Sequence, residues 1–328
     1  MKVLTYAEAL NSALEEEMKR DESIYIMGED IGKHGGAFGV TMGLINKFGE
    51  KRVVETPISE EGYTGIALGS ALLGNRPVVE IMYIDFISLA MDQIVNQAAK
   101  MRYMFGGKVK VPIVIRTQCG AGRSNAGQHS QSLEAWFYHI PGLKVVMPST
   151  PQDAKGLLKS AIRDDNPVIF IEHKCLYNQK GEVEEGEFTT PLGKADIKRK
   201  GNDLTLIATS FMVPRALKIA EKLSNNKSIE IEVIDLCTLY PLDLECILNS
   251  VKKTNRVVII QEAIRRGGVA SDIASLIMEE AFDYLDMPVK RICSFETIVP
   301  YNHLLEQYML PNEERIYSEI LKYLNYNI

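Results

Sequence analysis

Short apolar runs alternate with helical patterns along most of the chain. Apolar side chains recur every three or four positions in residues 6–19, a spacing typical of an amphipathic helix. Short runs typical of buried strands fall at residues 24–27, 53–54, 78–82, 111–116, 144–146 and 167–172. Between them the pattern predicts helices at residues 62–73, 86–101 and 151–163. This alternation predicts a mostly parallel sheet with helices on both faces.

A second α/β series follows a stretch in which the periodicity fades. Residues 177–203 are rich in Lys, Glu and Gly, as exposed connections often are. Further strands are predicted at residues 204–208, 231–234, 257–260 and 289–292, with helices up to residue 223 and from about residue 268. We therefore expect an α/β fold with two domains, 1–180 and 203–328, joined by a linker at 181–202. A length of 328 residues agrees with two domains.

Composition narrows the class of protein. The net charge is −6 and the charges are interspersed, whereas a nucleic-acid surface needs clustered Lys and Arg. The five cysteines are scattered and never form CxxC, which favours reduced thiols. No apolar run approaches the length of a membrane span, and the N-terminal residues show no signal or transit pattern. We expect a cytoplasmic enzyme or binding protein, with no nucleic-acid or membrane partner.

Glu60 is the first candidate for chemistry. It follows a predicted strand and precedes a predicted helix, at the strand end where parallel α/β sheets place ligand sites. A structural explanation competes, in which Ser59 caps the helix while Glu60 and Glu61 favour its positive end. The spacing alone favours the structural explanation.

A polar segment of the sequence contains His129, which could move protons near neutrality, although a plain surface histidine is the commoner outcome. Residues 122–126 are similar to a nucleophile elbow, but Ala126 stands where the second glycine belongs, so the hydrolase signal is weak. The glycines at 62, 65 and 69 do not have dinucleotide-binding spacing and favour close helix packing instead.

Several motifs occur together in one order, and this combination is far more specific than any one of them. They are Gly28-Glu29-Asp30, Thr56-Pro57-Ile58-Ser59-Glu60, Asp92-Gln93-Ile94, Gly127-Gln128-His129-Ser130-Gln131, Pro141-Gly142-Leu143-Lys144-Val145-Val146 and Asp153-Ala154-Lys155-Gly156-Leu157-Leu158. With them the chain closely resembles the β subunit of the thiamine-dependent decarboxylating component of 2-oxo acid dehydrogenase complexes. That family includes pyruvate, branched-chain and acetoin enzymes. The resemblance implies a pyrimidine-binding domain followed by a transketolase-like C-terminal domain, and it favours a functional Glu60.

The resemblance implies that Glu60 contacts the pyrimidine ring of thiamine diphosphate. The cofactor's own amine becomes a base once an acid protonates the opposite ring nitrogen, and a carboxyl group suits that role. The resemblance also assigns Phe86 to stacking on the ring. It places Ile58 and Met82 in the pyrimidine pocket and Glu29 beside it.

His129 matches the family's active-site histidine, which assists substrate binding and acyl transfer to lipoamide. The resemblance further implies a structural K⁺ held through oxygens at Ile113, Ala161, Ile162, Asp164 and Asn166. A plain helix-ending Asp-Asn-Pro turn remains the alternative for the latter part of this set.

The magnesium half of a thiamine site is missing from the sequence. Thiamine enzymes hold the diphosphate through Mg²⁺ with a GDG motif and a later Asn, and the chain has no GDG. The resemblance therefore implies an α subunit that holds the Mg²⁺, an α2β2 heterotetramer, and docking on a lipoyl acyltransferase core.

The expected reaction is decarboxylation of a 2-oxo acid such as pyruvate, or cleavage of acetoin, with transfer of the acyl group to lipoamide. The segments at residues 35–41, 82–86 and 102–104 look closer to acetoin and pyruvate subunits than to branched-chain ones. Two other functions remain open: a split transketolase-like enzyme acting on sugar phosphates, and a non-catalytic assembly subunit.

Overall fold

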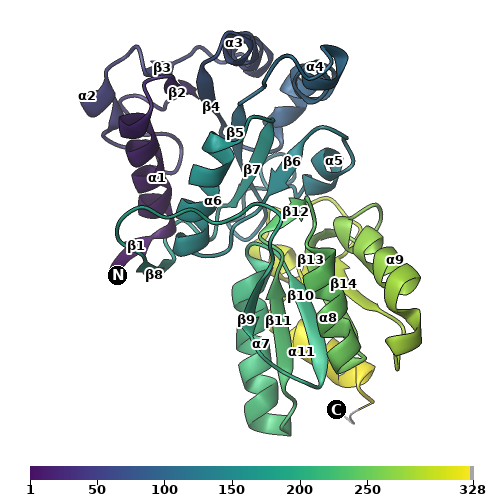
Figure 1. The fold of residues 1–328 in the computed structure, drawn as a ribbon. Coiled ribbons are helices and arrows are strands. Elements are labelled where there is room, and N and C mark those ends of the chain that lie inside the picture. Colours follow the sequence, from purple (N-terminus) through teal and green to yellow (C-terminus); the bar gives the residue numbers. More distant parts are fainter. Residues whose placement is uncertain (326–328) are drawn as a thin grey trace. The chain divides into compact units, whose positions relative to one another are not determined.

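The computed structural model describes residues 1–325 and divides them into two compact units (Figure 1). The N-terminal unit consists of Met1–Cys119 and Trp136–Leu192. The C-terminal unit consists of Gly120–Ala135 and the chain from Gly193 onward. The domain limits expected at residues 180 and 203 stay a prediction. The segment of residues 120–135 groups with the C-terminal unit although it lies early in the sequence.

A parallel sheet forms the centre of the N-terminal unit. Its strand order is β6-β7-β5-β4-β2-β3, and each neighbouring pair is parallel. The strands are β2 (Ile24–Gly28), β3 (Val53–Glu55), β4 (Arg76–Ile81), β5 (Val114–Cys119), β6 (Lys144–Val146) and β7 (Val168–His173). Most residues of β4, β5 and β7 are buried, as expected for strands covered on both faces. The predicted parallel α/β sheet is confirmed.

Helices of the N-terminal unit surround this sheet. They are α1 (Tyr6–Arg20), α2 (Leu44–Phe48), α3 (Glu60–Leu72), α4 (Ala99–Met104), α5 (Glu134–Tyr138) and α6 (Pro151–Arg163), of which α5 begins at the end of residues 120–135. Thr5 caps α1 in a reciprocal capping box with Glu8, and Thr150 caps α6 with Pro151 in the first turn. A two-stranded antiparallel sheet pairs β1 (Lys2–Thr5) with β8 (Lys180–Val183).

The helix predicted at residues 86–101 is helical throughout, but it is not a uniform α-helix. It begins as a 3-10 turn η1 (Phe86–Ala90), contains a π-helical turn η2 (Gln93–Ala98) and ends as α4. π-Helical turns are rare and recur at functional sites. The strand predicted from residue 111 begins at Val114, because Pro112 has no N–H to donate to a neighbouring strand.

The C-terminal unit has its own sheet, in the order β14-β13-β10-β11-β9. Four strands are parallel: β10 (Leu204–Ala208), β11 (Ile231–Asp235), β13 (Val257–Ile264) and β14 (Lys290–Ser294). β9 (Asp196–Arg199) is antiparallel to β11. Residues 181–202, predicted to be an exposed connection, therefore contain β9 and most of β8, whose pairing the faded periodicity did not predict.

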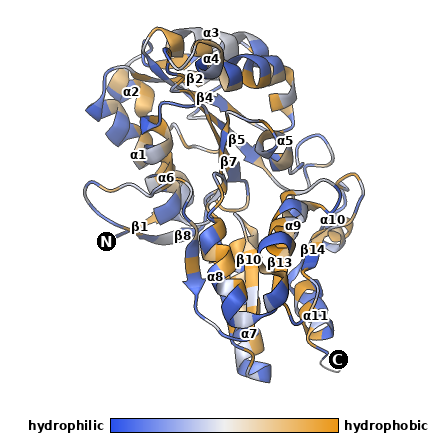
Figure 2. Ribbon diagram, turned by 45° about the vertical axis from the view of Figure 1, so that its right-hand side comes forward, coloured by the Kyte–Doolittle hydropathy of each residue, from blue (hydrophilic) through white to orange (hydrophobic). Residues whose placement is uncertain are grey.

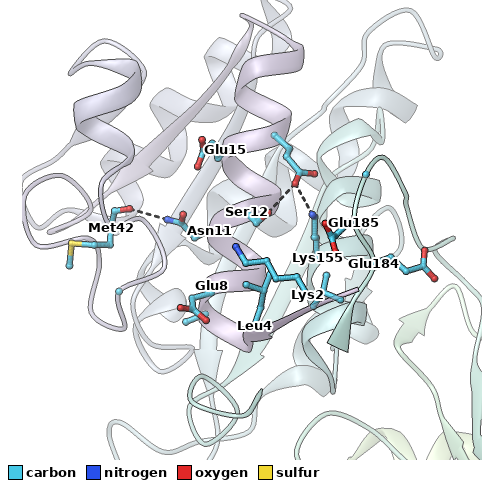
Figure 3. Close-up of a pocket in the computed structure, with 15 residues that line it drawn as sticks. Lys2, Leu4, Glu8, Asn11, Ser12, Glu15, Met42, Lys155, Glu184 and Glu185 are labelled. Carbon is cyan, nitrogen blue, oxygen red and sulfur yellow. Dashed lines mark hydrogen bonds and ion pairs between the residues drawn. The ribbon is translucent and has the colours of Figure 1, made fainter. Parts of the chain in front are cut away.

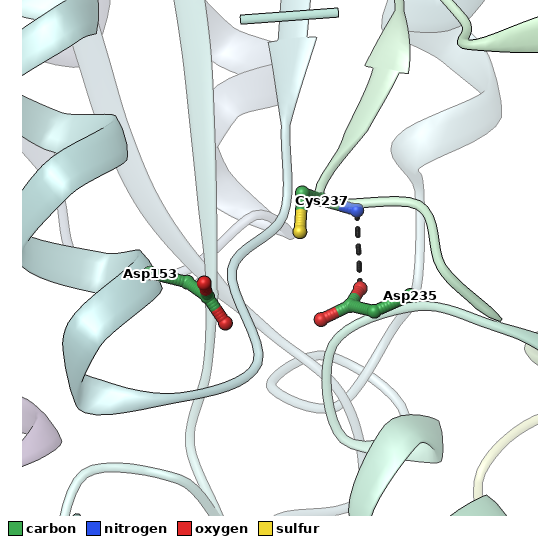
Figure 4. Close-up of side chains that lie close together, drawn as sticks. All are labelled: Asp153, Asp235 and Cys237. Carbon is green, nitrogen blue, oxygen red and sulfur yellow. Dashed lines mark hydrogen bonds between the residues drawn. The ribbon is translucent and has the colours of Figure 1, made fainter. Parts of the chain in front are cut away.

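Helices flank the second sheet, and apolar strands lie between them (Figure 2). They are α7 (Met212–Lys227), α8 (Leu244–Thr254), α9 (Val269–Ala281), the turn η3 (Phe282–Tyr284), α10 (His303–Met309) and α11 (Glu313–Tyr323), and the unit also contains β12 (Thr238–Tyr240). The turn after β11 is closed by the N–H of Cys237, which donates to Asp235 over 3.0 Å (Figure 4). All five cysteines are free thiols. None of the helices in residues 1–325 has both the length and the apolar character needed to span a bilayer.

Candidate active site

The carboxyl ends of β2, β3 and β4 lie along one edge of the N-terminal sheet. Gly28, the last residue of β2, is paired with Glu55 on one side and Glu80 on the other. A Cβ atom at position 28 would lie 2.5 Å from the carbonyl oxygen of Glu80, so only glycine allows this close approach. The residues that follow these three strands are therefore brought to the same edge, as ligand-binding residues are in open α/β sheets.

Glu60 is the first residue of α3 and only 6% of it is exposed. Ser59 occupies the N-cap position, but its side chain makes no capping hydrogen bond. Glu61, the next residue, is exposed. The capping explanation for this acidic pair therefore fails at Ser59, and Glu60 differs from Glu61 in being withdrawn from solvent.

Glu29, directly after β2, is a second buried carboxyl group in the same region. Burial raises the pKa of Glu29, and so does the negative charge of Glu60, while a hydrogen bond with Tyr63 lowers it. Its Oε1 atom is buried and has no hydrogen-bond partner in the described chain. A carboxyl group with a raised pKa and an unsatisfied oxygen can hold a proton near a ligand.

Tyr63, one turn along α3, completes this group. Burial, followed by the charges of Glu29 and Glu60, raises the pKa of Tyr63, so that its hydroxyl remains a donor. The carboxyl groups of Glu29 and Glu60 and the phenol of Tyr63 thus lie close together near the start of α3, with more acceptor oxygens than donors. The cluster can accept a hydrogen bond from a ligand or share a proton with it.

Aromatic side chains border the same sheet edge. Phe86 begins η1, and its ring meets Tyr83 edge-to-face at 5.5 Å. Tyr83 also meets Phe38 edge-to-face, and Phe38 stacks on Tyr177 at 4.7 Å. Phe86 is partly exposed, so part of the side chain is open to a ligand or a neighbouring chain.

The remaining predicted pocket residues differ in exposure. Met82 follows β4 and is partly buried, whereas Ile58 is 81% exposed. An isoleucine this exposed does not line an enclosed pocket within the N-terminal unit. It can line one only if a further surface covers it.

A buried ion cluster supports the sheet beneath this edge. Arg116 of β5 is fully buried and makes a bidentate pair with Glu172 of β7, at 2.7 and 2.8 Å. It also donates to Glu80 of β4 over 2.6 Å, and the Tyr177 hydroxyl donates to Glu172. The cluster links three adjacent strands by side-chain contacts.

The positions expected to bind K⁺ lie near the start of β5 and the end of α6. They are Ile113, Ala161, Ile162, Asp164 and Asn166. The guanidinium of Arg76 donates to the carbonyl oxygens of Ile162 and Asp164, at 2.9 and 3.1 Å. These oxygens are of the kind that K⁺ binds, but two of them already bind a cation that the chain supplies.

His129 lies in the C-terminal unit, on the loop of residues 120–133. Its backbone N–H donates to the carbonyl of Ala126, and the residue is partly exposed. No helix follows Ser124 directly, so the strand–turn–helix context of a nucleophile elbow is missing from this described segment.

A cavity of about 570 Å³ adjoins the His129 loop inside the C-terminal unit. The residues on either side of His129, Gln128 and Ser130, line it. Its apolar lining includes Ile298, Val299 and Met309. The hydroxyl of Ser130 is buried without a hydrogen-bond partner in the described chain. A cavity of this size with a mixed lining can hold a partly apolar group.

A second cavity in the N-terminal unit lies against α1 and is rich in carboxylates (Figure 3). Its Glu16 pairs with Lys155 and Lys159 over 2.6 and 3.0 Å. Ser12 also donates to Glu16. This glutamate is therefore satisfied within the unit and indicates no ligand.

Sequence reasoning missed Tyr63 and Arg116. Tyr63 could have been found, since it lies three residues after Glu60 and therefore on the same helix face. The partners of Arg116 lie on strands far apart in the sequence, and no local pattern pairs them.

Comparison with known families covers both units. Residues 2–180 match the family described as "Transketolase, pyrimidine binding domain", and residues 193–316 match "Transketolase, C-terminal domain". Among solved structures, a split-gene transketolase in an inactive β4 tetramer has a TM-score of 0.80 and covers 98% of both chains. Its sequence identity is 22%, so this likeness supports the fold alone.

Relatives of known activity are much closer in sequence. The chain is 49% identical to the β subunit of acetoin:2,6-dichlorophenolindophenol oxidoreductase of Bacillus subtilis, over 98% of each chain. It is 46% identical to the β subunit of the pyruvate dehydrogenase E1 component of Rickettsia felis, over 99% of each. Identity to the β subunit of 2-oxoisovalerate dehydrogenase of Bacillus subtilis is 44%, over 96% and 97%. The chain therefore belongs to the transketolase-like E1 β subunits of the thiamine-dependent 2-oxo acid and acetoin dehydrogenases.

Proposed function

We propose that this chain supplies the pyrimidine half of a thiamine diphosphate site, with Glu60 as its acid–base residue. The observation that carries the proposal is the withdrawal of Glu60 from solvent at the start of α3, beside the unsatisfied carboxyl oxygen of Glu29. An aminopyrimidine ring has both a nitrogen that accepts a proton and an amine that donates, so it fits a site with surplus acceptor oxygens. When bound, thiamine diphosphate supplies a carbanion-type nucleophile for cleaving the bond next to a carbonyl group.

Each candidate residue of the N-terminal unit has a definite task in this proposal. Glu60 shares a proton with the ring nitrogen, and Glu29 accepts a hydrogen bond at its unpaired Oε1. Phe86 and Met82 contact the flat ring, and Ile58 contacts it once the partner chain covers the site. These tasks match the chemistry of the side chains and their place at one sheet edge.

The diphosphate end belongs to another chain in this proposal. The sequence has no GDG motif, so Mg²⁺ and the diphosphate are assigned to an α subunit in an α2β2 assembly. Exposed apolar side chains support such a partner. Ile66 of α3, Leu89 of η1, and Tyr103 and Met104 of α4 are each at least 60% exposed, on neighbouring elements.

The reaction we propose is decarboxylation of a 2-oxo acid, pyruvate foremost, or cleavage of acetoin. The acyl group then passes to a lipoyl group on an acyltransferase core, and His129 assists that transfer. The identities of 49% and 46% to acetoin and pyruvate subunits support this reaction. The identity of 44% to a 2-oxoisovalerate subunit keeps a branched-chain substrate as the alternative. The transketolase-like alternative rests on the two domain-family matches and on a fold likeness at 22% identity.

Two finer features are part of the proposal. A cytoplasmic location agrees with five free thiols. A structural K⁺ near Ile162 and Asp164 would share their carbonyl oxygens with Arg76. If replacing Na⁺ by K⁺ does not raise the melting temperature, the K⁺ assignment is wrong and Arg76 is the cation at these oxygens.

Glu60→Gln in the reconstituted α–β enzyme tests the central assignment. The amide keeps the size of the side chain but cannot donate a carboxyl proton, so we expect kcat to fall about 100-fold or more. Glu61→Gln, the exposed neighbour on the same turn, is the matched control and should leave kcat unchanged. Normal activity in Glu60→Gln would favour a non-catalytic assembly subunit instead.

A further inference from the structure

The loop that carries His129 has an unusual backbone. Every second residue in its first half has a positive φ: Gly120 at 92°, Gly122 at 102°, Ser124 at 56° and Ala126 at 60°. Serine and alanine rarely adopt this conformation and do so at a cost in free energy. A backbone that alternates in this way turns successive N–H groups toward one side and forms a concave surface for an anion.

Two glutamates of the same unit occupy that concave surface. The N–H of Ala121 donates to Glu262 of β13 over 2.7 Å. The N–H of Gly122 donates to Glu306 of α10 over 2.9 Å, and the N–H of Ser124 reaches both oxygens of Glu306 at 3.2 and 3.0 Å. Hydrogen bonds from N–H groups to a carboxylate are roughly twice as strong as those between neutral groups.

Glu306 is buried in the first turn of a capped helix. The residue is fully buried, and its carboxylate accepts hydrogen bonds from the N–H groups of Gly122 and Ser124. Asn302 caps α10 by accepting from Leu304 and Leu305, and the N–H of Glu306 donates back to Asn302 over 2.9 Å. The carboxylate is therefore presented from the first turn of a capped helix, and the loop N–H groups are its hydrogen-bond donors.

The loop is also closed at its base, close to His129. The N–H of Gly120 donates to the carbonyl of Gln131 over 3.0 Å, and His129 lies two positions before Gln131. The first half of the loop is thus fixed by Glu262 and Glu306, and the second half is tied to it. The first half of the loop is therefore connected to the segment that carries His129.

We infer that Glu262 and Glu306 are positioning residues, whose carboxylates hold the strained loop of residues 120–131 so that His129 is presented for acyl transfer. The inference rests on the proposed role of His129. It also accounts for the elbow-like segment of residues 122–126, where the N–H of Ser124 binds a carboxylate and Ser124 is not a nucleophile.

The test uses the reconstituted α–β enzyme with Glu306→Gln, Glu262→Gln and, as a matched control, Glu314→Gln. Glu314 is exposed and lies in the same unit. Hydrogen–deuterium exchange is read on peptides covering residues 120–132. Two rates are measured beside it: turnover with an artificial electron acceptor, and reductive acylation of a lipoyl domain.

We expect Glu306→Gln to speed exchange in this loop by about tenfold or more, because a neutral amide binds the three N–H contacts less strongly. Glu262→Gln, which weakens the contact with the N–H of Ala121, should act in the same direction. Reductive acylation should fall by about tenfold in Glu306→Gln, while turnover with the artificial acceptor changes less than about twofold. The control should match the wild-type enzyme in all three measurements.

Two results would overturn the inference: unchanged loop exchange in Glu306→Gln, or faster exchange with undiminished acylation. A His129→Ala variant separates this from a failure of the proposed function. If His129→Ala acylates the lipoyl domain normally, the role of His129 is wrong. The exchange measurement then still decides whether the two glutamates hold the loop.

Discussion

Buried charges in the N-terminal unit are paired across strands, and their environment sets their protonation. Glu172 is fully buried, and burial raises its pKa while Arg116 and Tyr177 lower it. The arginine compensates two carboxylates, Glu172 and Glu80, at 2.6–2.8 Å. Removing one partner of such a cluster lowers the free energy of unfolding far more than replacing the whole cluster by apolar residues. The reason is that the remaining charges stay buried without compensation.

Arg116→Met should therefore lower the free energy of unfolding of the N-terminal unit by about 3–5 kcal/mol. A carboxyl group whose folded pKa is raised binds a proton more tightly in the folded state than in the unfolded one. Stability therefore rises as the pH falls toward that raised pKa. We expect the decrease in the free energy of unfolding caused by Arg116→Met to be smaller at pH 5 than at pH 7.5. Urea unfolding at the two pH values measures it, and an equal loss at both would contradict the account.

At the scale of single elements, some glycines are required because a side chain would not fit, whereas others have open space where a side chain would lie. Gly69 in α3 has nothing within 4 Å of where a Cβ would lie. Gly142 has a φ of 104°, and a Cβ there would lie 2.0 Å from the carbonyl oxygen of Ala99. Gly69 therefore lies on an open face of α3. Gly142 is required by its backbone conformation and by the lack of room for a Cβ atom.

Gly69→Ala should stabilise the isolated chain by about 0.5–1 kcal/mol, because alanine loses less backbone entropy in a helix. Gly142→Ala should destabilise it by about 2–4 kcal/mol, since the backbone strain and the clash add. Thermal unfolding of the two variants beside the wild-type chain measures both. A destabilised Gly69→Ala would mean that α3 is packed on that face within the chain itself.

The whole molecule leaves apolar surface exposed in both units. Tyr103 of α4 is 88% exposed, and in the C-terminal unit Ile298, Tyr301 and Leu304 are each at least 75% exposed. Large apolar side chains exposed in such numbers mark protein–protein contact surfaces. Together with a sequence that lacks GDG, they support a chain that functions only in an assembly.

The purified chain alone should therefore show no turnover and should bind thiamine diphosphate weakly. Half of a site contributes only part of the binding free energy, and the missing half holds the metal and the diphosphate. Isothermal titration calorimetry with and without Mg²⁺ is the measurement. Tight, Mg²⁺-dependent binding to this chain alone would refute the shared site.

Hydrophobic periodicity in the sequence by itself determined the two α/β series, since buried parallel strands and amphipathic helices leave local patterns. It placed most strands of both sheets within a few residues. The motif around Glu60 was likewise readable, because its parts are close in sequence. Local patterns did not predict β8 and β9, or the division of residues 86–104 into three kinds of helix.

Only the tertiary structure decided which distant residues meet. It withdrew Glu60 from solvent while leaving Glu61 exposed, and it gave Arg116 two carboxylates from strands that are remote in sequence. It also placed Glu306 under the N–H groups of Gly122 and Ser124, more than 180 residues away. These contacts depend on the order of strands in a sheet and on the path of loops. Side-chain burial and charge compensation act between neighbours in space, which a local sequence pattern cannot specify.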